Sequence, residues 1–227
     1  MAKEPEKLWV DVDHYLTEQL RLSDPILDAT MAANAAAKLP AIDVSPNQGR
    51  FLQLLVALCG ARKILEIGTL GGYSAICMAR ALPPGGRVIS LEYDSRHAEV
   101  AQANIQRARL ADRIEIRIGA ALESLPRIEK EGAAPFDFLF IDADKPNNPF
   151  YLDWAVRLSR PGSLIIVDNV VRDGEILDGK TTDPSIQGTR RMFELMSANP
   201  RLAATALQTV GLKGYDGFAM ALVTAAQ

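Results

Sequence analysis

Two short acidic segments, Asp142-Ala-Asp-Lys145 and Asp168-Asn169, hold the side chains best suited to chemistry in this sequence. Each follows an apolar run typical of a buried strand. Because the carboxyl ends of neighbouring parallel strands meet at one edge of a sheet, the two segments are predicted to converge. Two unpartnered carboxylates repel, and a hard divalent cation relieves that repulsion. We therefore predict a metal site formed by Asp142, Asp168 and Asn169.

These oxygen ligands favour Mg²⁺, with Ca²⁺ or Mn²⁺ as alternatives, and the lack of Cys and His disfavours zinc. Magnesium takes about six ligands, so three protein oxygens leave room for both oxygens of a catechol and one water. The cation would lower the pKa of the catechol hydroxyl and orient it. Lys145 and Asp142 are the predicted catalytic residues, with Lys145 either removing the proton or stabilising the oxyanion. Asp144 is expected either to face a cofactor or to hold Lys145.

A second informative segment is Glu66-Ile-Gly-Thr-Leu-Gly-Gly-Tyr-Ser74, whose glycines allow a tight turn against a ligand. Its spacing differs from the Gly-x-Gly-x-x-Gly that binds a dinucleotide pyrophosphate, and Glu66 would repel a phosphate. A carboxylate there suits S-adenosylmethionine, which carries a sulfonium and an ammonium. Glu92 ends the next apolar run and is predicted to bind the ribose hydroxyls. Ala121, after the third run, leaves room for adenine.

From Gly60 onward, short apolar runs alternate with helical patterns, which predicts an α/β fold with a parallel sheet covered by helices on both faces. A turn-rich segment joins the last two runs, which predicts a hairpin at one edge and an antiparallel last strand. The predicted strands are Lys63–Ile67, Arg87–Glu92, Ile114–Ile118, Phe136–Ile141, Ser163–Val167, Leu202–Val210 and Gly217–Thr224. The predicted helices in this region are 73–82, 95–109, 120–131, 148–159 and 185–198.

Residues 1–44 are predicted to form a helical N-terminal extension to a domain that spans residues 45–227. Trp9 and Tyr15 lie on an amphipathic stripe that is predicted to pack against the core. A lid over the substrate and a dimer contact are the alternatives. Cys59 and Cys77 fall in apolar helical patterns, so both are predicted to be buried thiols in a reducing compartment rather than a disulfide.

The chain has 227 residues, 25 of them Lys or Arg and 28 Asp or Glu, which gives a net charge of −3. This balance argues against nucleic acid as a partner. No apolar stretch approaches the ~20 residues of a membrane span, and the first residues are polar. We therefore predict a cytoplasmic protein with no membrane partner.

Together the segments Glu66–Ser74, Ile141–Lys145 and Val167–Asn169 resemble the cation-dependent O-methyltransferase family, which includes caffeoyl-CoA and catechol O-methyltransferase-like proteins. The resemblance runs from about Ser45 to the C-terminus. It implies a seven-stranded Rossmann-like class I methyltransferase fold, usually as a homodimer, with the metal ligands and the catalytic lysine named above. It also implies S-adenosylmethionine contacts at Val44, Glu66, Gly68, Thr69, Ser74, Glu92, Ala121 and Asp144.

Two segments depart from the plant enzymes of that family. Pro146–Tyr151 replaces an Asn-Tyr pair that usually follows the lysine, and Val170–Gly174 lacks their Trp-Asn and resembles bacterial members. A smaller catechol or a flavonoid is therefore as consistent with the sequence as caffeoyl-CoA. Within these segments, Tyr151 and Asp173 are the predicted acceptor contacts.

The predicted function is metal-dependent, in-line transfer of a methyl group from S-adenosylmethionine to a hydroxyl of a catechol-type aromatic acceptor. An NAD-dependent oxidoreductase would explain the glycine turn and Glu92, but not Glu66 or the acidic cluster. A non-catalytic S-adenosylmethionine-binding protein would not need the intact cluster. Methylation of nucleic acid or protein is disfavoured by the acidic balance and by the lack of an Asn/Asp-Pro-Pro-Tyr motif.

Overall fold

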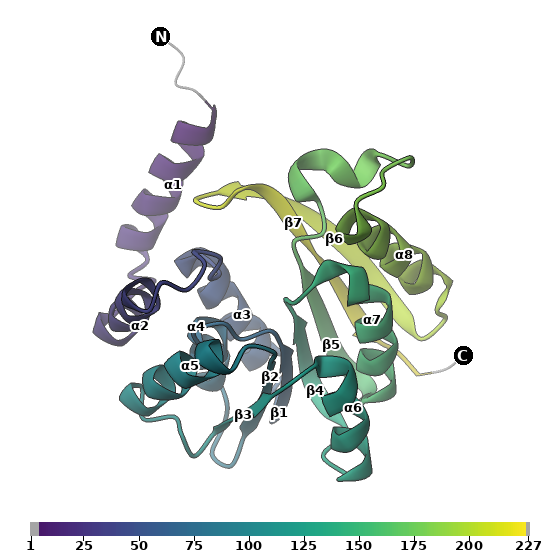
Figure 1. The fold of residues 1–227 in the computed structure, drawn as a ribbon, viewed down its shortest axis with the longest axis horizontal. Coiled ribbons are helices and arrows are strands. Elements are labelled where there is room, and N and C mark those ends of the chain that lie inside the picture. Colours follow the sequence, from purple (N-terminus) through teal and green to yellow (C-terminus); the bar gives the residue numbers. More distant parts are fainter. Residues whose placement is uncertain (1–4, 226–227) are drawn as a thin grey trace.

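The computed structural model describes residues 5–225, which form a seven-stranded sheet with helices on both faces (Figure 1). The strand order is β3-β2-β1-β4-β5-β7-β6. β7 runs antiparallel to both β5 and β6, while β1 to β5 pair in parallel. The α/β class, the seven strands and the antiparallel last strand are therefore confirmed. The strands are β1 (Lys63–Ile67), β2 (Arg87–Glu92), β3 (Ile114–Ile118), β4 (Phe136–Ile141), β5 (Ser159–Asp168), β6 (Leu202–Gly211) and β7 (Gly214–Val223).

Several helices begin where a side chain caps free backbone N–H groups and a proline occupies the first turn. Asp24 accepts hydrogen bonds from the N–H groups of Ile26 (2.9 Å) and Leu27 (3.1 Å). Ser45 and Asp183 start their helices in the same way. The helices are α1 (Pro5–Gln19), α2 (Pro25–Ala36), α3 (Pro46–Leu58), α4 (Tyr73–Ala79), α5 (Ser95–Arg107), α6 (Ala121–Lys130), α7 (Asn148–Arg157) and α8 (Pro184–Ala198).

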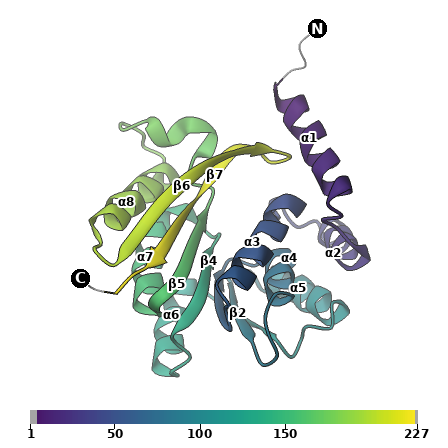
Figure 2. The same ribbon diagram turned by 180° about the vertical axis from the view of Figure 1, so that it is seen from behind.

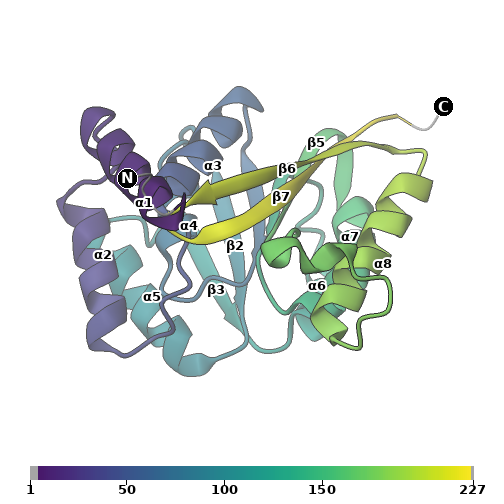
Figure 3. The ribbon, with the colours of Figure 1, turned by 90° about the horizontal axis from the view of Figure 1, so that it is seen from above.

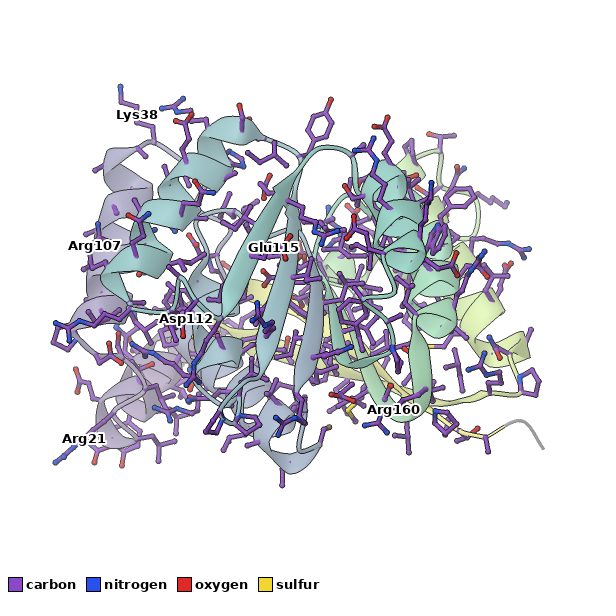
Figure 4. All side chains as sticks on the ribbon, turned by 90° about the horizontal axis from the view of Figure 1, so that it is seen from below. Arg21, Lys38, Arg107, Asp112, Glu115 and Arg160 are labelled. Carbon is purple, nitrogen blue, oxygen red and sulfur yellow. The ribbon has the colours of Figure 1, made fainter. Side chains whose placement is uncertain are left out.

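The core lies on both faces of the sheet. Helices α3, α4 and α5 cover one face with α2 beyond them, and α6, α7 and α8 cover the other, as Figures 2 and 3 show. All six residues of β4 are buried. The charged residues Arg21, Lys38 and Arg107 lie at the rim on the side of α2 and α5 (Figure 4). Because the central strands are buried and paired with one another, they hold the ends of β1 to β5 in fixed register.

The fifth strand begins at Ser159, four residues earlier than predicted. The segment Pro161-Gly162 is typical of a turn, and Gly162 has φ 90°. The pairing with β4 is nevertheless continued across an irregularity. Ser163 stabilises it, because its hydroxyl accepts from Arg160 N–H (3.0 Å) and donates to the Phe136 carbonyl (2.6 Å).

Two predictions for the first 60 residues are wrong. Helix α1 has no buried residue, and Tyr15 is 61% exposed rather than packed in the core. Instead α1 rests against the β6–β7 turn, where Asp13 accepts a hydrogen bond from Leu212 N–H (2.7 Å). Cys59 is exposed because it follows the end of α3, whereas Cys77 is buried as predicted.

Among the described residues, none of the helices combines the length and the apolar character that crossing a membrane requires. A cytoplasmic location stays a prediction.

Candidate active site

A cavity of about 770 Å³ lies at the carboxyl ends of the parallel strands. The loops after β1 to β5 line it, so the strand order spreads their residues along its length. Gly119, Ala120 and Ala121 after β3 lie at one end, and Asn169 after β5 lies at the other. The predicted site residues that line the cavity are Val44, Gly68, Thr69, Ser74, Glu92, Ala121, Asp142, Asp144, Lys145, Tyr151 and Asn169. Glu66, Asp168 and Asp173 do not line it.

The glycine turn after β1 is pressed against the end of β4. Gly68 has φ 92°, and a Cβ at this position would lie 2.1 Å from the Asp142 carbonyl oxygen. Only glycine fits such a close approach without a shift of the backbone. The turn is thus fixed beside Asp142, the first residue of the predicted metal site.

Glu92 holds the same turn from the other side. Its Oε2 accepts hydrogen bonds from the N–H groups of Thr69 (3.2 Å) and Leu70 (2.8 Å), and its Oε1 accepts from Asp94 N–H (3.0 Å). His97 Nδ1 lies 3.5 Å from Oε1. The sequence suggested a ribose contact for Glu92 and gave no sign of this second, structural task.

Glu66 does not line the cavity, although its partner Ser74 does. It is fully buried and accepts hydrogen bonds from the hydroxyls of Ser74 (2.6 Å) and Ser90. Burial raises the pKa of its carboxyl to about 7, against the hydroxyl hydrogen bonds, which lower it. Any effect on a ligand therefore passes through Ser74, which lines the cavity, or through the electric field of the carboxylate.

The acidic cluster forms where β4 and β5 end side by side, with Ile141 opposite Val167. Asp168 is 5% exposed, and its oxygens accept from Asn169 N–H (2.8 Å) and Gln48 Nε2 (2.5 Å). Burial, followed by the nearby charge of Asp142, raises the pKa of Asp168 above its usual value. The two carboxylates are thus close enough to repel.

Lys145 is the counter-ion of this pair of acids. Its buried ammonium lies 3.0 Å from Asp142 Oδ1. Asp144 does not hold Lys145, so that alternative is wrong. Asp144 instead accepts from the Tyr151 hydroxyl (2.5 Å) and from Asn147 Nδ2 (2.6 Å). Burial and the carboxylate of Asp144 raise the pKa of Tyr151 well above its usual value.

Within residues 5–225, no three His, Cys, Asp or Glu side chains form a group that could hold a metal ion. The predicted ligand set has two carboxylates and the amide of Asn169, so it is not a group of three His, Cys, Asp or Glu side chains. Asn169 adopts a left-handed conformation with φ 55°, and it lines the cavity next to Asp168. The cluster therefore offers oxygen donors only, as a hard cation prefers.

Gln48 and Arg172 belong to the site but were missed by the sequence reasoning. Gln48 lies on α3, 120 residues from its partner Asp168. Arg172 lines the cavity from the loop after β5. Gln48 lies in no spacing pattern, so no local signal marks it. Arg172 lies in the segment Val170–Gly174, from which Asp173 was predicted instead.

Comparison with known proteins bears on this geometry. The profile of the O-methyltransferase family matches residues 18–222. A catechol O-methyltransferase from Niastella koreensis is 55% identical over 217 residues, which cover 96% of this chain and 98% of the relative. A crystal structure of an O-methyltransferase from Bacillus cereus in complex with SAH has a TM-score of 0.95 and 59% identity, covering 96% of this chain and 99% of that one. The O-methyltransferase TomG from Streptomyces achromogenes, solved with SAM, has a TM-score of 0.95 and 44% identity, with 98% and 100% coverage.

Proposed function

The chain belongs to the O-methyltransferase family and is an S-adenosylmethionine-dependent O-methyltransferase, and we propose that it methylates catechol-type acceptors with the help of a divalent cation. The observation that carries the proposal is the meeting of Asp142 and Asp168 at the ends of β4 and β5, beside the cavity that the glycine turn also lines. The catechol O-methyltransferase relative supports the same acceptor class.

We assign the donor to the part of the cavity lined by the loops after β1, β2 and β3. Gly68 and Thr69 are proposed to let the backbone approach the ligand. The Glu92 carboxylate, which accepts from the N–H groups of Thr69 and Leu70, is proposed to accept hydrogen bonds from ribose hydroxyls as well. Ala121 leaves room for adenine. Asp144 and Val44 line the same cavity and are proposed as further contacts.

The acceptor end fits a hard cation. Asp142, Asp168 and Asn169 present carboxylate and amide oxygens on adjacent segments. The repulsion between buried Asp168 and partly buried Asp142 is the kind that a cation relieves. Bound there, Mg²⁺ or a similar ion would lower the pKa of an acceptor hydroxyl. Gln48 holds Asp168 in place for this role.

Lys145 is proposed to act on the acceptor oxygen. An ammonium paired with Asp142 can donate a hydrogen bond, which suits stabilisation of an oxyanion. Lys145 could act as a base toward the acceptor hydroxyl only after its own ammonium had lost a proton. Tyr151 lines the same region and is fixed by Asp144, so it is proposed to orient the ring. Asp173 is exposed and outside the cavity lining, and we derive no contact for it.

A methyl-transfer assay tests this function. Aromatic vicinal diols should be methylated by the enzyme in Mg²⁺, and EDTA should abolish the activity until Mg²⁺ is restored. Asp142→Ala should lose turnover while keeping most of its affinity for SAH in calorimetry. Asp153→Ala, an exposed acid on α7, is the matched control and should keep both. Full activity of Asp142→Ala in EDTA would show that no cation takes part.

We also propose that the chain works as a homodimer. The exposed apolar side chains Leu54 and Leu58 of α3, Leu207 and Val210 of β6, and the unburied α1 offer surface for a partner. No residue of α1 lines the cavity, which favours a dimer contact over a lid. Sedimentation equilibrium should give a dimer mass, and a monomer at micromolar concentration would refute this assignment.

A further inference from the structure

Arg172 is a cavity residue whose charge has no partner among the residues that the structure describes. Among the described residues, the cavity lining contains one lysine, Lys145, and one arginine, Arg172. Lys145 is paired with Asp142. Within residues 5–225 no carboxylate forms an ion pair with Arg172. Its Nε is buried and has no hydrogen-bond partner in the described part of the chain. A buried guanidinium N–H without an acceptor is unfavourable unless a ligand supplies one.

The loop that carries Arg172 is strained and well supported. Arg172 (φ 56°), Asp173 (φ 53°) and Gly174 (φ 86°) are three successive residues in the left-handed region, which costs free energy for the two that are not glycine. Asp216 Oδ1 compensates, because it accepts from the N–H groups of Val171 and Arg172, each at 3.0 Å. Strain that is maintained in this way is typical of a residue positioned for function.

Arg172 also lies at the acceptor end of the cavity. It follows β5, three residues after Asn169, whereas Gly119 and Ala121 after β3 mark the opposite end. An acceptor whose hydroxyls reach Asp142 and Asn169 therefore shares its part of the cavity with the guanidinium.

We propose that Arg172 is a specificity-determining residue that favours catechol-type acceptors with an anionic substituent, a ring carboxylate in particular. This inference rests on the proposed function. A guanidinium binds a carboxylate through two parallel hydrogen bonds, and Arg172 lines the cavity without a carboxylate partner among the described residues. The same charge disfavours acceptors that carry an ammonium. Stacking of Arg172 on the ring is the rival explanation, and it would favour all three acceptor types alike.

Three acceptors with one core separate these explanations: catechol, 3,4-dihydroxybenzoate and 3,4-dihydroxyphenethylamine. The kcat/KM values are measured for the wild type, Arg172→Gln and Arg172→Glu, with Arg191→Gln as control. Arg191 is an exposed arginine on α8 that pairs with Glu194. Glutamine keeps an unbranched side chain at the left-handed position. The intrinsic reactivities of the acceptors cancel when a kcat/KM ratio between two acceptors is compared between variants.

We expect the kcat/KM for 3,4-dihydroxybenzoate, relative to that for catechol, to fall about tenfold in Arg172→Gln, because the variant loses a charged hydrogen bond. In Arg172→Glu the preference between 3,4-dihydroxybenzoate and 3,4-dihydroxyphenethylamine, measured by kcat/KM, should reverse. Arg191→Gln should leave all kcat/KM ratios between acceptors unchanged. Equal losses for all three acceptors would overturn the proposal and support stacking or a damaged loop, which melting temperatures would reveal.

Calorimetry with the SAH-loaded protein keeps this test independent of turnover. If no acceptor is methylated, or if EDTA has no effect, the proposed function fails. The binding of 3,4-dihydroxybenzoate relative to catechol still reports on Arg172. A relative affinity that is unchanged in Arg172→Gln overturns the inference in that case as well.

Discussion

Replacement of Glu66 by glutamine should remove a pH dependence from the stability of this protein. Glu66 is fully buried, and its burial raises the pKa of the carboxyl from 4.5 to about 7, although Ser74 and Ser90 donate hydrogen bonds to it. The folded protein therefore keeps the Glu66 proton over a pH interval in which the unfolded chain has released it. An amide of the same shape has no proton to lose in that interval.

The sign follows from which state binds more protons. A carboxyl whose pKa is raised on folding stabilises the fold fully below pH 4.5, and this contribution disappears as the pH rises through about 7. One pKa unit corresponds to about 1.4 kcal/mol, so the shift of the Glu66 pKa from 4.5 to about 7 changes the free energy of unfolding by about 3 kcal/mol. The Glu66→Gln variant should therefore gain about 3 kcal/mol in the free energy of unfolding, relative to the wild type, between these pH values.

Urea unfolding at a series of pH values from about 5 to about 8 measures this difference. The protein is studied without cofactor and in a chelator, so that no bound cation changes the charge near Glu66. Glu99→Gln, an exposed acid on α5, is the control and should track the wild type. A difference between Glu66→Gln and wild type that does not change with pH would refute the reasoning, because it would mean that burial does not control the ionisation of Glu66.

Three further predictions concern the residues around the donor site. Gly68→Ala should lower the free energy of unfolding by about 2 kcal/mol or more, because its Cβ would meet the Asp142 carbonyl; an unchanged melting temperature would contradict this contact. Glu92→Ala should weaken S-adenosylmethionine binding at least tenfold in calorimetry, since it loses a proposed ribose contact and frees the glycine turn; wild-type affinity would remove both roles. Asn34→Ala should destabilise the fold by about 2 kcal/mol in urea, because buried Asn34 donates to Asp43 (2.8 Å) and accepts from Asn104 Nδ2 (2.9 Å); an effect below ~0.5 kcal/mol would show that these two bonds contribute little.

The strand–helix alternation was sufficient to predict the sheet, because buried parallel strands require continuous apolar runs. It was insufficient for the start of β5, where Pro161-Gly162 is typical of a turn and the strand continues through the hydrogen bonds of Ser163. It also failed for α1. An amphipathic stripe predicts that a helix has a partner surface but does not identify that surface, and Tyr15 remains exposed in the single chain.

Much of the site could be predicted from the sequence because parallel strands end at one edge, and that rule alone brings Asp142 beside Asp168. Side-chain direction is a different matter. Asp142 and Asp144 are both within three residues of Lys145, and only the fold decides that Asp142 pairs with it. Contacts such as that of Gln48 with Asp168 depend on the packing of distant elements and leave no local pattern.

The proposed donor and acceptor sites are joined by one strand pairing. Ile67 lies opposite Ile141, Asp142 N–H donates to the Ile67 carbonyl (2.9 Å), and Gly68 rests against the Asp142 carbonyl. Asp142, the proposed cation ligand at the acceptor end, thus also supports the turn that is proposed to face the donor. Methyl transfer needs the reacting atoms within about 3.5 Å, and small misplacements are costly in rate. Changes that move Gly68 relative to Asp142 should therefore lower kcat more than they weaken the binding of either substrate, because they disturb the spacing between two sites that are each still formed.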